Sequence, residues 1–180
     1  MIAAGPAGNI QWKRKESDVG APVGKVSTTI ELGGFAEYWA SDSIRLRGDL
    51  RKGVNGHEGL VGSFGGDYVW RDGDRYALLV GPRLNFSNGR YQREYFGVTP
   101  EAALASGLPV YRPDGGLHSV AANSALHYSL GGGWGMFGYA RYERLVGDAR
   151  TVDRLVIRWP SGLIPPATYP VVRSATITSR

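Results

Sequence analysis

The chain has 180 residues, with 21 Lys and Arg against 16 Asp and Glu, 27 glycines and no cysteine. This length suits one domain with a buried core, and the lack of cysteine excludes disulfides, thiolate metal sites and cysteine nucleophiles. Apolar segments rich in aromatic residues argue against disorder. No uninterrupted apolar run approaches the ~20 residues that a membrane-spanning helix needs.

The start of the chain is small and broken by Gly and Pro, and it precedes the basic cluster Lys13-Arg14-Lys15. A secretory signal has the opposite order, a basic segment followed by ~7–15 apolar residues. We therefore expect a chain that is either cytosolic or lacks its beginning.

Apolar and polar residues alternate with a period of two, which indicates β-strands. Turn signals lie between them: Asp72-Gly73, Asn88-Gly89 and the triplet Gly131-Gly132-Gly133 each predict a hairpin. The alternation predicts antiparallel strands at residues 2–13, 26–39, 42–52, 60–70, 76–86, 91–96, 117–130 and 134–145.

The segment 99–107 breaks this alternation. Thr99 precedes Pro100, Glu101 stands in the first turn, alanines follow, and Gly107 closes the run. These are start and stop signals of a helix, so we expect one short capped helix in a long connection, residues 97–116.

Two architectures share this pattern. A soluble barrel or sandwich hides its apolar face, whereas a transmembrane barrel turns that face to lipid and keeps a polar lumen. Glycines within strands and strands of ten or more residues favour the transmembrane barrel. The apolar faces also end in aromatic residues, as interfacial girdles do. These aromatics are Tyr38, Trp39, Tyr68, Trp70, Tyr76 and Phe86. The predicted fold is an all-β antiparallel outer-membrane barrel.

One block of sequence is specific enough to name a family. Tyr95-Phe96-Gly97-Val98-Thr99-Pro100, followed by Ser106-Gly107-Leu108-Pro109-Val110-Tyr111, resembles the MipA/OmpV family, the MltA-interacting proteins of the Gram-negative outer membrane. Further similar segments are residues 33–38, 45–47, 56–61, 81–83, 139–142 and 145–148. The resemblance implies a non-enzymatic barrel that links a murein lytic transglycosylase to a peptidoglycan synthase.

Both ends depart from the family. Its members begin with a signal peptide and further strands, and they end in a strand that closes on an aromatic residue. This chain ends in Ser179-Arg180. We therefore expect a truncated or frame-shifted reading frame, a barrel region over 1–148, a divergent tail over 149–180, and a barrel that is incomplete.

Three groups of polar residues are candidates for chemistry. His57-Glu58 stands in a Gly-rich segment and lacks the second His of a helical zinc motif, so a polar turn is expected. Asp67, Asp72 and Asp74 do not fit a calcium loop and are expected in a hairpin. His127 and Ser129 with Glu143 resemble the triad of lipid A deacylases, which leaves a lipid-modifying enzyme as one alternative.

The charged strand faces suggest a lumen. Because basic residues alternate with apolar ones and have acidic neighbours, a lumen wall or contact with lipopolysaccharide explains them better than nucleic-acid binding. A channel or binder for small anionic solutes is the other alternative. The predicted lumen residues are Arg45, Arg47, Asp49, Arg51, Asp67 and Arg83.

For partner contacts or gating we expect the long connection, because such loops are usually functional. The residues concerned are Tyr95, Phe96, Gly97, Val98, Thr99, Pro100, Ser106, Gly107, Leu108, Pro109 and Tyr111. We predict no catalytic residue, cofactor or metal. The expected partners are outer-membrane lipid, a transglycosylase and a peptidoglycan synthase.

Overall fold

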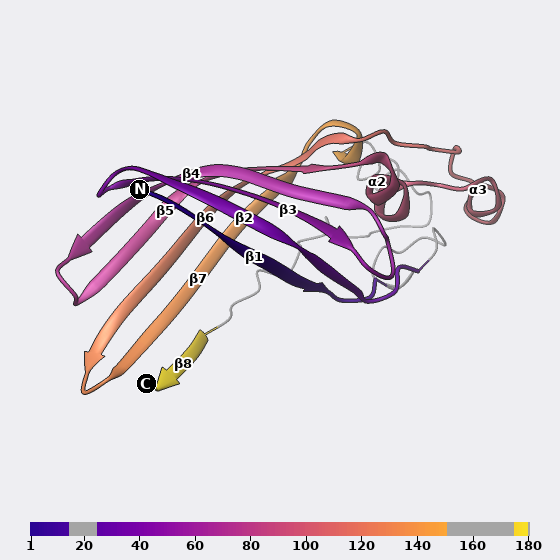
Figure 1. Ribbon diagram of the computed structural model, residues 1–180. Helices are drawn as coiled ribbons and strands as arrows, with labels where there is room; N and C mark the ends of the chain where they lie inside the picture. The colour runs from indigo at the N-terminus through magenta and orange to yellow at the C-terminus, as the bar shows by residue number, and fades with distance from the viewer. Residues whose placement is uncertain (15–24, 151–174, 180) are drawn as a thin grey trace.

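A computed structural model describes residues 1–14, 25–150 and 175–179 (Figure 1). These residues form one antiparallel sheet in which each strand pairs with the next along the chain. The sheet curls into a half-barrel (Figure 1). The strands are β1 (Ile2–Gln11), β2 (Thr29–Ser41), β3 (Ile44–Gly53), β4 (Leu60–Asp72), β5 (Tyr76–Ser87), β6 (Gly116–Gly131), β7 (Trp134–Leu145) and β8 (Ala175–Ser179).

The all-β antiparallel prediction is therefore confirmed. β8 was not predicted, and the bounds of the predicted strands differ from those observed by a few residues at most, with one exception. The helical content is small: α2 (Gly89–Phe96) and α3 (Pro100–Ser106). Neither helix, nor any other in the part of the chain described, is long and apolar enough to span a membrane.

The exception is residues 91–96, for which we predicted a strand and which lie in α2. The Asn88 side chain accepts a hydrogen bond from the Tyr91 backbone N–H, which makes Asn88 the N-cap of the helix. An Asn-Gly pair fits both a tight hairpin and a helix start. The strand predicted there was therefore wrong, and the chain between β5 and β6 holds two helices. α3, the helix predicted within residues 97–116, begins and ends as predicted, with Thr99 as N-cap and Gly107 as C-cap.

The two ends of the sheet differ. Short hairpins join β2 to β3, β4 to β5 and β6 to β7 at one end, which we call the hairpin rim. The longer connections, including α2 and α3, lie at the opposite end, the helix rim (Figure 1). The first residue of the chain lies at the hairpin rim, because the Met1 carbonyl accepts from the Trp39 backbone N–H at 2.8 Å.

The side chains of the sheet are arranged with polar groups on the concave face and apolar groups on the convex face. Asp67 and Arg83 are buried inside, whereas Leu50, Phe64 and Trp70 are exposed outside. This distribution is the reverse of that in a soluble protein, where apolar side chains are buried in the core. Tyr38, Tyr68, Tyr76 and Phe86 also face outward, as predicted, but Trp39 faces inward, with Arg45 and Arg71 over its ring.

Candidate functional site

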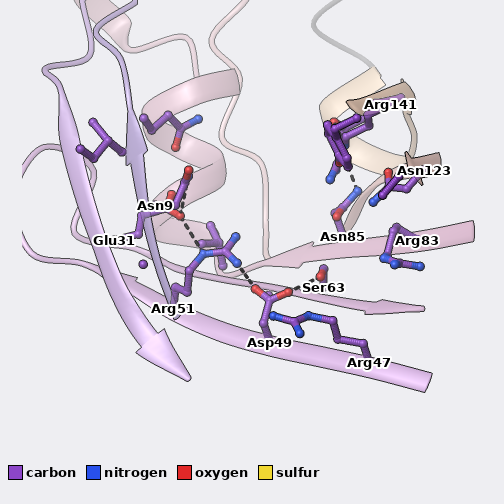
Figure 2. Close-up of a pocket in the computed structure, with 18 of the residues that line it drawn as sticks. Asn9, Glu31, Arg47, Asp49, Arg51, Ser63, Arg83, Asn85, Asn123 and Arg141 are labelled. Carbon is purple, nitrogen blue, oxygen red and sulfur yellow. Dashed lines mark hydrogen bonds and ion pairs between the residues drawn. The ribbon is translucent and has the colours of Figure 1, made fainter. Parts of the chain in front are cut away.

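The concave face encloses a cavity of about 900 Å³. Strands β1 to β7 and helix α2 all contribute to its lining, so residues far apart in the sequence share one wall. Figure 2 shows its polar side chains pointing inward from both halves of the sheet. The cavity exists because alternate residues of each strand face inward and because the sheet is curved.

Hydrogen bonds run across three strands on the side of the cavity built by β2, β3 and β4. Arg51 donates from Nε to Glu31 at 3.0 Å and also pairs with Asp49, which accepts from Ser63 (Figure 2). Asn9 of β1 donates to the same Glu31 at 3.1 Å. Each acidic group is thus held by donors from neighbouring strands.

A second cluster lies nearer to the hairpin rim. Asp67 accepts from Arg45 and from Arg83, each at 2.6 Å, and its side chain is only 2% exposed. Glu37 accepts from Arg47 at 3.0 Å. Charge-assisted hydrogen bonds of this kind stabilise a buried carboxylate that would otherwise be costly to desolvate.

The opposite wall carries a third cluster on β5, β6 and β7. Asn85 donates to Ser119 at 2.8 Å and to Glu143 at 3.0 Å. Ser119 also donates to Glu143, and Arg141 donates from Nε to the other oxygen of this carboxylate at 3.0 Å. From the sequence we predicted Glu143 only for the enzyme alternative and missed Arg141, because both faces of β7 hold aromatic side chains and the pattern does not tell which face points inward.

All six predicted lumen residues line the cavity, but they do not form a positive surface. The lining holds five arginines and four carboxylates. Every one of these arginines is in an ion pair. Hence the near-balance of charge gives no support to the anionic-solute alternative.

At the helix rim, α2 covers the end of the cavity with aromatic rings. Tyr91 contacts His57 at 4.8 Å between ring centroids, stacks on Tyr95 at 4.6 Å and lies 5.6 Å from His118. Its hydroxyl accepts from Gln11 of β1 at 3.2 Å. Burial raises the pKa of Tyr91 well above its usual value and that of Tyr95 to about 12, so both phenols stay neutral at ordinary pH.

The predicted partner residues that follow α2 mostly stabilise the loop itself. Val98 and Leu108 are buried together, and Tyr111 pairs with Val98 as an isolated bridge. Ser106 donates to the Ala102 carbonyl and accepts from the Leu108 backbone N–H. The exposed apolar side chains of this loop are instead Leu104, 90% exposed, and Val110.

His57 lies in the turn between β3 and β4, as predicted, but it is not a surface residue of that turn. Its ring is buried, with Nε2 3.2 Å from a Glu31 oxygen and Nδ1 accepting from the Gly59 backbone N–H at 2.9 Å. Glu58 points away and pairs with Arg90 at the surface. The partner of His57 therefore comes from β2, a contact that spacing along the sequence does not reveal.

The structure does not bring together the three residues of the enzyme alternative. His127 pairs in register with Phe137, whereas Glu143 pairs with Ala121, six residues away along β6. Within residues 1–14 and 25–150, no three His, Asp or Glu side chains lie close enough to hold a metal ion. Asp72 ends β4 at the predicted hairpin, while Asp67 lies inside the cavity.

Comparison with known proteins identifies a family. The model of the family described as MltA-interacting protein MipA matches residues 2–151. No curated protein and no solved structure matches the chain significantly. The matched region contains the seven strands and the helix that build the cavity.

Proposed function

Because the chain belongs to the MltA-interacting protein family, we propose that it is an outer-membrane β-barrel protein that holds a murein lytic transglycosylase near a peptidoglycan synthase. The observation that carries the proposal, beside the family, is the inverted sheet: apolar side chains cover the convex face, and ion pairs fill the concave one. An apolar convex face of this kind is stable in contact with lipid, whereas its exposure to water is unfavourable.

The difference between the two rims gives the proposal a direction. Outer-membrane barrels have short turns on the periplasmic side and longer loops outside the cell. By this rule the hairpin rim faces the periplasm, and the helix rim with α2 and α3 faces outward. A transglycosylase that acts on the cell wall can then reach the hairpins only, so we place its docking surface there.

This placement assigns a different task to the long connection. The residues from Val98 to Tyr111 form a small packed unit at the helix rim, with Leu104 and Val110 at its surface. Under the proposal they serve in gating or in contacts outside the cell. The wall partner is expected at Asp42, Asp74 and Gly132, which lie in or beside the three hairpins.

Photocrosslinking tests the proposal. The full chain is placed in lipid vesicles with p-benzoylphenylalanine at Asp74 or at Leu104, and purified MltA-type transglycosylase is added on each side in turn. We expect a crosslink from position 74 and none from position 104. A crosslink from 104 alone would reverse the assigned orientation, and no crosslink from position 42, 74 or 132 would contradict the scaffold function.

A further inference from the structure

The cavity has unsatisfied hydrogen-bonding capacity on one wall. The Asn123 side-chain oxygen is buried and accepts no hydrogen bond from the described residues. Leaving such a group without a partner costs about 1–3 kcal/mol. Because this oxygen has almost no free surface in the structure, a donor from a bound molecule reaches it once the amide turns toward the cavity. Asn123 lines the cavity and faces into it (Figure 2).

A donor stands beside this acceptor. Asn123 pairs in register with Arg141 of β7, whose guanidinium binds Glu143 through Nε and whose side chain is 31% exposed. Since a guanidinium has five N–H donors in a fixed plane, the remaining edge of Arg141 can donate to a bound molecule. The wall thus offers an amide acceptor and guanidinium donors side by side, a pattern that matches neighbouring hydroxyl groups, each of which donates and accepts.

Two further features define the ligand class. The ion pairs leave the cavity close to neutral, so neither an anion nor a cation gains a strong Coulomb attraction. Next to the polar wall, Tyr139 and Phe137 of β7 also line the cavity and provide flat apolar surface. The cavity volume is within the range of small-molecule sites, about 300–1,000 Å³.

We propose that the cavity binds a neutral polyhydroxylated molecule, a sugar or short oligosaccharide. Its hydroxyls bond Asn123 and Arg141, and its C–H face lies on the ring of Tyr139. The site needs no partner protein, so this inference stands or fails separately from the scaffold function.

The test is calorimetric titration of the refolded full chain in detergent with maltose, cellobiose and N,N′-diacetylchitobiose. Trigalacturonate and citrate serve as an acidic sugar and an acid that is not a sugar. We expect saturable binding of at least one neutral disaccharide, with both acids about tenfold weaker or more. No binding of any neutral disaccharide, or tighter binding of citrate, would overturn the proposal.

Variants assign the contacts. Asn123→Leu removes the acceptor and is expected to weaken binding about tenfold, equivalent to about 1.4 kcal/mol, whereas Asn123→Asp keeps an acceptor and retains binding. If Asn123→Leu does not fold, as judged by near-UV circular dichroism, Tyr139→Leu takes its place and is expected to weaken binding similarly. Arg90→Gln at the outer surface is the control. Unchanged affinity in a folded Asn123→Leu or Tyr139→Leu protein contradicts the assignment.

Discussion

At the scale of single residues, Asp67 links two strands by accepting from Arg45 on β3 and Arg83 on β5. Its carboxylate is at once desolvated and doubly paired. Removing one partner of a buried ion pair leaves the other charge without compensation, which costs much more than the pair itself gains. Stability on this wall therefore depends on complete clusters.

We predict that Asp67→Ala lowers the free energy of unfolding by about 3–5 kcal/mol, because it leaves the buried Arg83 guanidinium without a carboxylate and Arg45 with only its 3.5 Å contact to Glu37. Urea titration of the refolded protein in detergent measures the change. Glu58→Ala is the matched control: it breaks the exposed pair with Arg90, and the expected loss is at most about 1 kcal/mol. Equal losses of unfolding free energy in the two variants would show that the buried Asp67 cluster stabilises the protein no more than an exposed ion pair does.

At the scale of elements, β4 and β5 approach closely at two glycines. A Cβ added to Gly81 of β5 would lie 1.8 Å from the Gly66 carbonyl oxygen of β4. No side chain fits there without a shift of the backbone. This contact lies between the register pairs Gly65–Arg83 and Tyr68–Val80 of the two strands.

Gly81→Ala is accordingly expected to destabilise the protein by at least about 1–3 kcal/mol, the usual cost of overpacking. Gly138→Ala on β7 is the comparison, because a Cβ at that position meets nothing within 4 Å. It should be neutral or slightly stabilising through reduced freedom of the unfolded chain. Thermal unfolding of both variants in the same detergent measures the difference. An unchanged unfolding temperature for Gly81→Ala would disprove the close contact.

Elements were more predictable from sequence than their contacts. The alternation in β3 and β4 predicted both the strands and which side chains face the cavity, since each charged position has an apolar neighbour. β7 carries aromatic residues on both faces, so its facing needed the structure. Asn88 begins a helix where a hairpin was expected, and the contacts of Glu31 with His57 or of Asn85 with Glu143 depend on strand register, which local sequence does not encode.

At the scale of the whole molecule, the inverted sheet makes a prediction about its surroundings. Phe64 is 50% exposed on the convex face and pairs with Gly48 near the middle of β3. Phe64→Arg should therefore destabilise the protein in lipid vesicles by about 2–4 kcal/mol, the cost of a charge at the bilayer midplane. Heat-dependent gel mobility and urea unfolding in vesicles measure it.

Leu104→Arg provides the control, since Leu104 is exposed on α3 at the helix rim and lies outside the proposed bilayer. We expect no change in stability from this variant. Were Phe64→Arg equally harmless in vesicles, the convex face would not be in contact with lipid. The edges of the sheet also need pairing partners in such an environment, because lipid offers no hydrogen bonds to an exposed strand.

If the chain is an outer-membrane protein, as proposed, the strict alternation of β3 also has a consequence for its export. Leu46 and Leu50 are flanked by Arg45, Arg47, Asp49 and Arg51, so their apolar character never accumulates along the chain. The export channel of the inner membrane retains segments that present about 20 apolar residues in succession. Here the apolar face forms only when the strands pair. The unpaired chain therefore passes the export channel as a polar segment, and it gains affinity for lipid only on folding.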